Sequence, residues 1–154
     1  MAAIRIITDS TADLSPELLA AHGVRVVPLL VQFDDESYQD GVDINPDRLF
    51  QMVAERNKLP KTASPAVGTF RQAFAEAAAD GSQVLFIGIS AKFSATAQNA
   101  QIAAAEFPEG QVRVFASRNL STGIGLQVLH ACDLVHEGTS MDEIIADLEA
   151  YQAG

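Results

Sequence analysis

The sequence predicts an α/β fold of Rossmann-like type, a mostly parallel β-sheet with helices on both faces. Continuously apolar runs alternate with amphipathic helical patterns, which is typical of parallel strands joined by helices. The runs are apolar at successive positions, as expected for strands that are buried on both sides. The chain has 154 residues, of which 48% are hydrophobic and 19% charged, enough for one domain with its own core. We therefore expect a single α/β domain over residues 1–154.

The strands follow from the apolar runs, taken in chain order. They are expected at 2–7, 24–33, 82–90 and 111–117, with a turn and a short extended segment over 34–44. Helical periodicity predicts helices over 16–22, 47–57, 94–107, 121–138 and 141–152, and a further one after Ser64–Pro65.

Capping residues support these helix limits. Ser15 and Asn45 each stand directly before a proline, the pattern of an N-cap with proline at the first helical position, and Ser64 repeats it. Gly23 and Gly138 are expected to end their helices. Ser140 and Glu143 have the spacing of a capping box for the last helix.

Composition excludes several classes of function. Twenty acidic and ten basic residues give a formal charge of −10, which repels nucleic acid and anionic membranes. No apolar run is long enough for a membrane helix and no signal peptide is recognisable, so we expect a cytoplasmic protein without membrane insertion. Cys132 is the single cysteine and lies in an apolar helical pattern, which favours a buried, inert thiol.

Hydroxyl side chains gather where the predicted strands end. Four Ser/Thr-rich stretches, each followed by a predicted helix, are "TDST" (8–11), "KTAS" (61–64), "SAKFSAT" (90–96) and "SRNLST" (117–122). Helix N-termini attract anions, and hydroxyls add neutral donors, so we expect an oxyanion site at this edge, with Thr8 and Ser10 among its contacts. The alternative is that some of these side chains only cap their own helices.

Other chemistry is poorly supported. The sequence has no P-loop, and the Gly88–Ser90 stretch lacks the second glycine of a nucleophile elbow. Asp40 and Asp43 flank a glycine, which is more typical of a turn than of a metal site. No catalytic residues, metal ligands or cofactor are predicted. One enzymatic alternative stays open, in which Asp9 serves a small-anion or phosphoryl-transfer reaction.

Five stretches of the sequence carry recognisable motifs, which are, in chain order, "IITDSTADLSPEL", "YQDGVDINPDRLF", "KTASPAVGTF", "ISAKFSATAQNA" and "ASRNLSTGIGLQV". In the same order they resemble the Thr-Asp-Ser-x-x-Asp-Leu, Tyr-x-Asp-Gly-Val-Asp-Ile, Lys-Thr-Ser-Gln-Pro, Ser-Ser-x-Leu-Ser-Gly-Thr-Tyr-Gln and Asp-Ser-x-x-x-Ser-x-Gly-x-Gly motifs of the DegV family of bacterial fatty-acid-binding proteins. The resemblance runs over the whole chain.

The resemblance implies a non-enzymatic protein that holds a long-chain fatty acid and presents it to an ATP-binding kinase subunit. Thr62 and Ser94 match the residues that contact the carboxylate, and Ser90 and Ser117 match neighbouring polar positions. Ala63 and Ser64 stand where the family has Ser-Gln. Family members are about twice as long, so we expect this chain to correspond to the first of two domains, with the second absent. An apolar surface left exposed in this way favours self-association.

Overall fold

The computed structural model describes residues 3–12, 14–33, 36–39, 43–88, 95–116 and 122–153. Its main element is a parallel sheet of four strands in the order β2-β1-β6-β7. The strands are β1 (Ile4–Asp9), β2 (Arg25–Val27), β6 (Gln83–Gly88) and β7 (Val112–Ala116). The predicted α/β class with a parallel sheet is confirmed.

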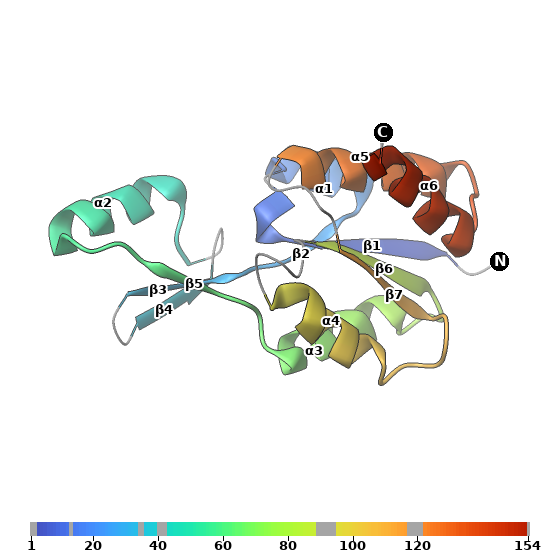
Figure 1. Cartoon of the computed structure of the whole chain (residues 1–154), viewed down its shortest axis with the longest axis horizontal. Coiled ribbons are helices and arrows are strands. Elements are labelled where there is room, and N and C mark those ends of the chain that lie inside the picture. The colour runs from blue at the N-terminus through green and yellow to red at the C-terminus, as the bar shows by residue number, and fades with distance from the viewer. Residues whose placement is uncertain are drawn as a thin grey trace.

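Helices cover both faces of this sheet (Figure 1). The short 3₁₀ helix η1 (Ser10–Ala12), α1 (Pro16–His22), α5 (Thr122–His136) and α6 (Met141–Ala153) lie on one face. On the other face lie α3 (Val67–Ala78) and α4 (Thr96–Ala104).

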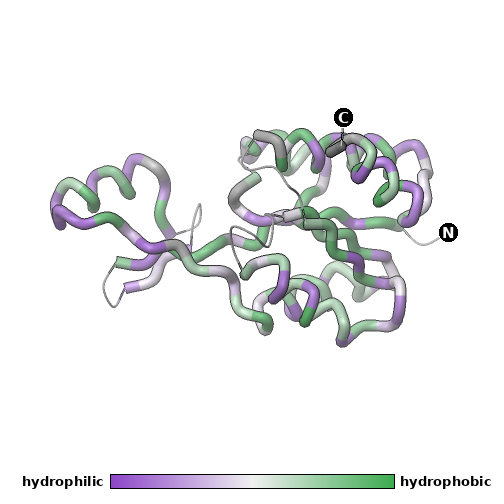
Figure 2. Tube along the Cα trace, viewed as in Figure 1, coloured by the Kyte–Doolittle hydropathy of each residue, from purple (hydrophilic) through white to green (hydrophobic). Residues whose placement is uncertain are grey.

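Each face has its own apolar core, because successive strand residues point to opposite sides. Ile6, Leu85 and Ile87 pack against α5 and α6, whereas Ile7 and Phe86 pack against α3 and α4. The strands of this sheet are hydrophobic along most of their length, as the hydropathy colouring shows (Figure 2). The continuously apolar strands of the sequence are therefore explained by a sheet buried on both sides.

A second sheet, which the sequence did not predict, lies to one side of the first (Figure 1). It is antiparallel, in the order β4-β3-β5, with strands β3 (Leu30–Phe33), β4 (Glu36–Gln39) and β5 (Lys61–Ala63). Helix α2 (Pro46–Arg56) packs on it through a small core of Val31, Phe33, Ile44 and Met52. We call residues 30–63 the arm.

The predicted single strand over 24–33 is wrong, because this stretch supplies one strand to each sheet. The break falls at Pro28 and Leu29, between β2 and β3. Proline has no N–H to donate to a ladder and is disfavoured within a central strand, so the chain leaves the parallel sheet there. The arm thus starts from the carboxyl end of β2 and returns through β5 to α3.

The predicted helix limits agree with the structure in most places. Ser15 accepts a hydrogen bond from the Leu18 N–H, and Asn45 accepts one from the Arg48 N–H. Gly23 follows α1 with φ 65°, a left-handed conformation that favours glycine. The Glu143 N–H donates to Ser140 at 3.4 Å, which is one half of the predicted capping box.

The predicted cap at Ser64 is wrong. Helix α3 begins at Val67, with Ala66 as its N-cap, so Pro65 does not occupy the first helical position. Pro65 instead lies buried in the connection between β5 and α3, where its carbonyl has another partner, described below.

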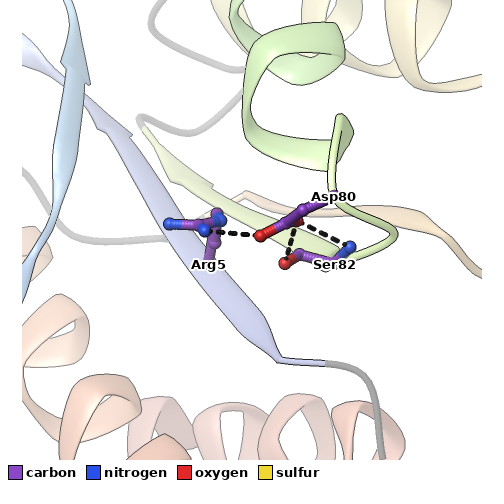
Figure 3. A network of polar contacts seen from close by, with 3 residues as sticks. All are labelled: Arg5, Asp80 and Ser82. Atoms are coloured by element: carbon purple, nitrogen blue, oxygen red, sulfur yellow. Dashed lines mark hydrogen bonds and ion pairs between the residues drawn. The ribbon is translucent and has the colours of Figure 1, made fainter.

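A polar network ties the amino ends of β1 and β6 together (Figure 3). Asp80 accepts hydrogen bonds from the Ser82 N–H at 3.1 Å, from the Ser82 hydroxyl at 2.5 Å and from Arg5 at 2.8 Å. These donors stabilise the ionised carboxylate, so they hold the pKa of Asp80 well below its ordinary value.

Candidate ligand-binding site

The strand order determines where a ligand site is expected. After β1 the chain adds β2 on one side, and then β6 and β7 on the other, so the order reverses between β1 and β6. Ligands of open parallel sheets bind beyond the carboxyl ends of the strands at such a reversal. Here those ends are Asp9 of β1 and Gly88 of β6. Among the described residues, the stretch 8–11 lies at this position, and Thr96 begins the helix α4 (Thr96–Ala104) that follows β6 in the chain.

Thr8 and Ser10 have structural partners at this edge. Thr8 is fully buried, and its hydroxyl donates to the Ile87 carbonyl at 2.7 Å, which joins β1 to β6. The Ser10 hydroxyl accepts from the Leu29 N–H at 3.0 Å, which ties η1 to the start of the arm. Both side chains therefore position the edge of the sheet. Their role as ligand contacts stays a prediction.

Asp9 and Gly88 lie against each other across the two strands. Asp9 is fully buried, and a Cβ placed on Gly88 would stand 2.7 Å from its Oδ2 and 2.4 Å from a ring carbon of Phe86. Only glycine leaves room for both neighbours at this position. The burial of Asp9 weighs against its use as a phosphoryl acceptor, because a nucleophile must be reachable by the donor.

Two of the hydroxyl stretches meet at the start of α4. The Thr96 hydroxyl, fully buried, donates to the Ser64 hydroxyl at 3.2 Å, although the residues are 32 positions apart. One turn further along α4, the Asn99 amide donates to the Pro65 carbonyl at 3.0 Å. The connection after β5 is therefore fixed to the first two turns of α4.

Capping does not account for these hydroxyls at α3 and α4. The N-cap residues of the two helices are Ala66 and Ala95, and neither provides a side-chain hydrogen bond to the first turn. The first N–H groups of a helix have no partner within it, so they present donors and a partial positive charge. For α3 and α4, the N-cap position therefore holds no hydroxyl, and the alternative that a serine or threonine at this position caps the helix is wrong for these two helices.

The residues matched to the carboxylate contacts are only partly described. Thr62 lies in β5, paired with Val31 of β3, where the sequence predicts no strand. The Thr62 side chain and residues Ser90, Ser94 and Ser117 lie outside the described residues. Thr62 precedes Ser64 by two positions, and Ser94 precedes Thr96 by two. The contact between Ser64 and Thr96 therefore joins the described ends of the two stretches through their side chains.

Sequence reasoning missed Asn99, the one residue of this group that carries an amide. It lies three positions after Thr96, so both side chains lie on the same side of α4. A half-buried asparagine in the second turn of a helix is a weak signal, because asparagine is unremarkable on helix surfaces. Only the fold reveals the carbonyl that it binds.

The described residues offer no metal centre. None of them form a group of three or more His, Cys, Asp or Glu side chains arranged to hold an ion. Asp43 accepts a hydrogen bond from the Gln39 N–H at 2.9 Å, whereas Asp40 and the predicted turn at Gly41 lie outside the described residues. Within the same described ranges, no helix is long and apolar enough to cross a membrane.

The fold and this edge define a class: a parallel α/β domain with an antiparallel arm and polar loops at its switch point. Within that class, the chain belongs to the DegV family. The family model described as "Uncharacterised protein, DegV family" matches residues 3–154. The resemblance seen in the five sequence motifs is thereby confirmed.

Relatives of known sequence and structure agree with this assignment. A DegV domain-containing protein from Deinococcus radiodurans is 43% identical over 95% of this chain. A fatty-acid-binding DegV family protein from Thermus thermophilus is 40% identical, with a TM-score of 0.91 over 98% of this chain. A stearic-acid-binding protein from Eubacterium ventriosum is 31% identical, with a TM-score of 0.87 over 96% of this chain. The chain spans 52%, 54% and 52% of these three proteins, about half of each.

Proposed function

We propose that this chain binds the carboxylate of a long-chain fatty acid at the carboxyl edge of its parallel sheet. Thr62 and Ser94 contact the carboxylate, with Ser90 and Ser117 beside them and Thr8 and Ser10 supporting the edge. The contact between Ser64 and Thr96, 3.2 Å long, carries the proposal, because it joins the stretch that contains Thr62 to the stretch that contains Ser94. The fatty-acid-binding relatives support the choice of ligand.

The local electrostatics suit such a ligand despite the overall charge of −10. Helix α4 begins at Thr96 behind an alanine N-cap, and the N–H groups and partial positive charge of this helix end favour an anion nearby. Such donors act over short distances, and salt screens the charge of more remote carboxylates beyond about 8 Å at physiological ionic strength. Hydroxyls and helix N–H groups can therefore hold a carboxylate without a lysine or arginine.

The acyl tail sets the affinity. Each buried methylene of the tail contributes about 0.8 kcal/mol to the binding free energy, and the tail is buried only in a covered tunnel. The chain corresponds to about half of its relatives, so we expect weaker binding than in a form extended to their length, which we call the extended form. Apolar side chains are exposed on the helices that cover the parallel sheet, for example Leu126 (51% exposed) and Ile102 (49% exposed). Such side chains favour self-association of the chain alone.

The test compares a fatty acid with its uncharged ester. The chain and the extended form are incubated with vesicles of phosphatidylcholine that carry equal amounts of stearate and methyl stearate, and bound lipid is measured by mass spectrometry. We call the ratio of bound stearate to bound methyl stearate the carboxylate preference. A preference well above one is expected for the wild-type protein. A preference near one, or no bound lipid in either form, would refute the proposal.

Variants of the two contact residues then test the site. Thr62→Val and Ser94→Ala are each expected to lower the carboxylate preference about tenfold, as for loss of one hydrogen bond to a charged group. Thr69→Val is the matched control, since Thr69 is exposed on α3. Equal effects of Thr62→Val and Thr69→Val would contradict the assignment of Thr62.

Presentation to a kinase is the second part of the proposal. We expect the loaded protein to bind an ATP-dependent fatty-acid kinase subunit and to have its ligand converted to an acyl phosphate there. Incubation of the loaded extended form with such a subunit and ATP should yield acyl phosphate, and Ser94→Ala should abolish the yield. Phosphate transfer to the protein itself, lost in Asp9→Asn, would instead support the phosphoryl-transfer alternative.

A further inference from the structure

Both connections between the arm and the parallel sheet are held by polar side chains at the carboxyl edge. The outgoing connection is held through Ser10, whose hydroxyl accepts from the Leu29 N–H at 3.0 Å. The returning connection is held through α4, by the bonds from Thr96 to Ser64 and from Asn99 to Pro65. The arm carries Thr62 in β5, directly before the returning connection.

Of these bonds, the one from Asn99 is placed to control the returning connection. Its amide donates to the buried Pro65 across 34 positions of sequence, at 3.0 Å. Pro65 lies two positions before Val67, the first residue of α3. Because proline has no backbone N–H, Pro65 cannot be held by a hydrogen bond that it donates itself. Loss of the amide would leave a buried carbonyl without this donor, and the connection would then shift toward water or another donor.

We infer that Asn99 is a positioning residue for the carboxylate site. It holds the end of β5, and hence Thr62, at a fixed position relative to the start of α4. The first residue of α4 follows Ser94 by two positions in the sequence. This inference rests on the proposed function and adds to it a residue outside the hydroxyl stretches. Small displacements of a binding group weaken contacts to a charged head group much more than contacts to an apolar tail, because hydrogen bonds depend steeply on distance and angle.

The experiment measures the carboxylate preference of Asn99 variants in the extended form. Asn99→Ala removes the amide, and Asn99→Asp keeps its shape while removing the donor to Pro65. Gln98→Ala is the matched control, since Gln98 is the neighbouring amide on α4 and is exposed. Both Asn99 variants are expected to lower the preference about tenfold, through weaker binding of stearate with unchanged binding of methyl stearate.

Hydrogen exchange gives a readout that needs no ligand. Amides of residues 61–64 should exchange faster in Asn99→Ala than in Gln98→Ala, if the bond to Pro65 holds this connection. Circular dichroism establishes that each variant is folded before either measurement.

The possible results separate the two proposals. A wild-type preference well above one that persists in both Asn99 variants overturns the inference and leaves the proposed function intact. The same holds if stearate and methyl stearate binding fall together, since that is the effect of a merely structural bond. A wild-type preference near one overturns the proposed function, and the inference with it.

Discussion

Replacement of Gly88 by alanine tests the packing beneath the candidate site. An added Cβ would stand 2.4 and 2.6 Å from two ring carbons of Phe86 and 2.7 Å from Oδ2 of Asp9. Phe86 cannot turn away freely, because it is fully buried and its ring centroid lies 5.1 Å from that of Phe70. Overpacking of this kind costs about 1–3 kcal/mol, and two blocked neighbours place Gly88→Ala toward the upper end. At about 2–4 °C per kcal/mol, the melting temperature should fall by roughly 4–12 °C.

Gly68→Ala is the matched control for this prediction. Gly68 lies in the first turn of α3, and nothing stands within 4 Å of a Cβ added there. Alanine should therefore leave stability unchanged or raise it by up to about 0.5 kcal/mol, since glycine is the poorer helix former. Thermal and urea unfolding of both variants give the comparison. Equal stability of Gly88→Ala and the wild type would show that Phe86 and Asp9 can move, and the reasoning from close contact would fail.

Three further predictions concern other parts of the fold. Gly125→Ala should also lower the unfolding free energy by about 1–3 kcal/mol, because its Cβ would stand 2.7 Å from the backbone carbonyl oxygen of Ala12; unchanged urea unfolding would contradict this. Burial raises the pKa of the Cys132 thiol from 9.0 to about 11, so iodoacetamide at pH 8 should modify the folded chain far more slowly than the urea-unfolded chain. The folded state favours the protonated thiol. The contribution of Cys132 to the free energy of unfolding is therefore complete below pH 9 and is lost as the pH rises toward 11. Hydrogen-bond donors of Ser82 and Arg5 lower the pKa of Asp80. The contribution of Asp80 to the free energy of unfolding is therefore present at pH values above its ordinary pKa of 3.8 and is lost as the pH falls below 3.8. Asp80→Asn should therefore lose less stability than the wild type between pH 5 and pH 2, measured by urea unfolding.

The elements of the parallel sheet were predictable from local signals. Strands β1, β6 and β7 are apolar at successive positions because helices cover both faces, and this pattern is visible without the structure. The caps at Ser15 and Asn45 were predictable for a similar reason, since the hydrogen bond that each makes lies within three positions of sequence.

The arm was not predictable in this way. Between the end of its strand β3 at Phe33 and the start of β5 at Lys61 lie 27 residues, and β5 itself has only three residues. So short a strand shows no alternation, and its pairing with β3 is a long-range contact that local propensity does not encode. The sequence therefore predicts no strand at "KTAS" (61–64), only a hydroxyl-rich stretch at the edge of the parallel sheet. The stretch reaches that edge as the end of a strand that belongs to another sheet.

The candidate site depends on the same long-range contacts. The sequence identified hydroxyl-rich stretches, but the partners of Ser64 and Pro65 are Thr96 and Asn99, more than 30 positions away. Because the arm leaves the sheet after β2 and returns before α3, the position of Thr62 depends on both of its connections. Under the proposed function, the polar side chains that hold these connections belong to the site even where they do not contact the ligand. A change in the arm should then affect the carboxylate preference only if it moves β5. Substitution of the exposed Phe50 of α2 (72% exposed) should leave the preference unchanged, whereas loss of the Asn99 amide should lower it.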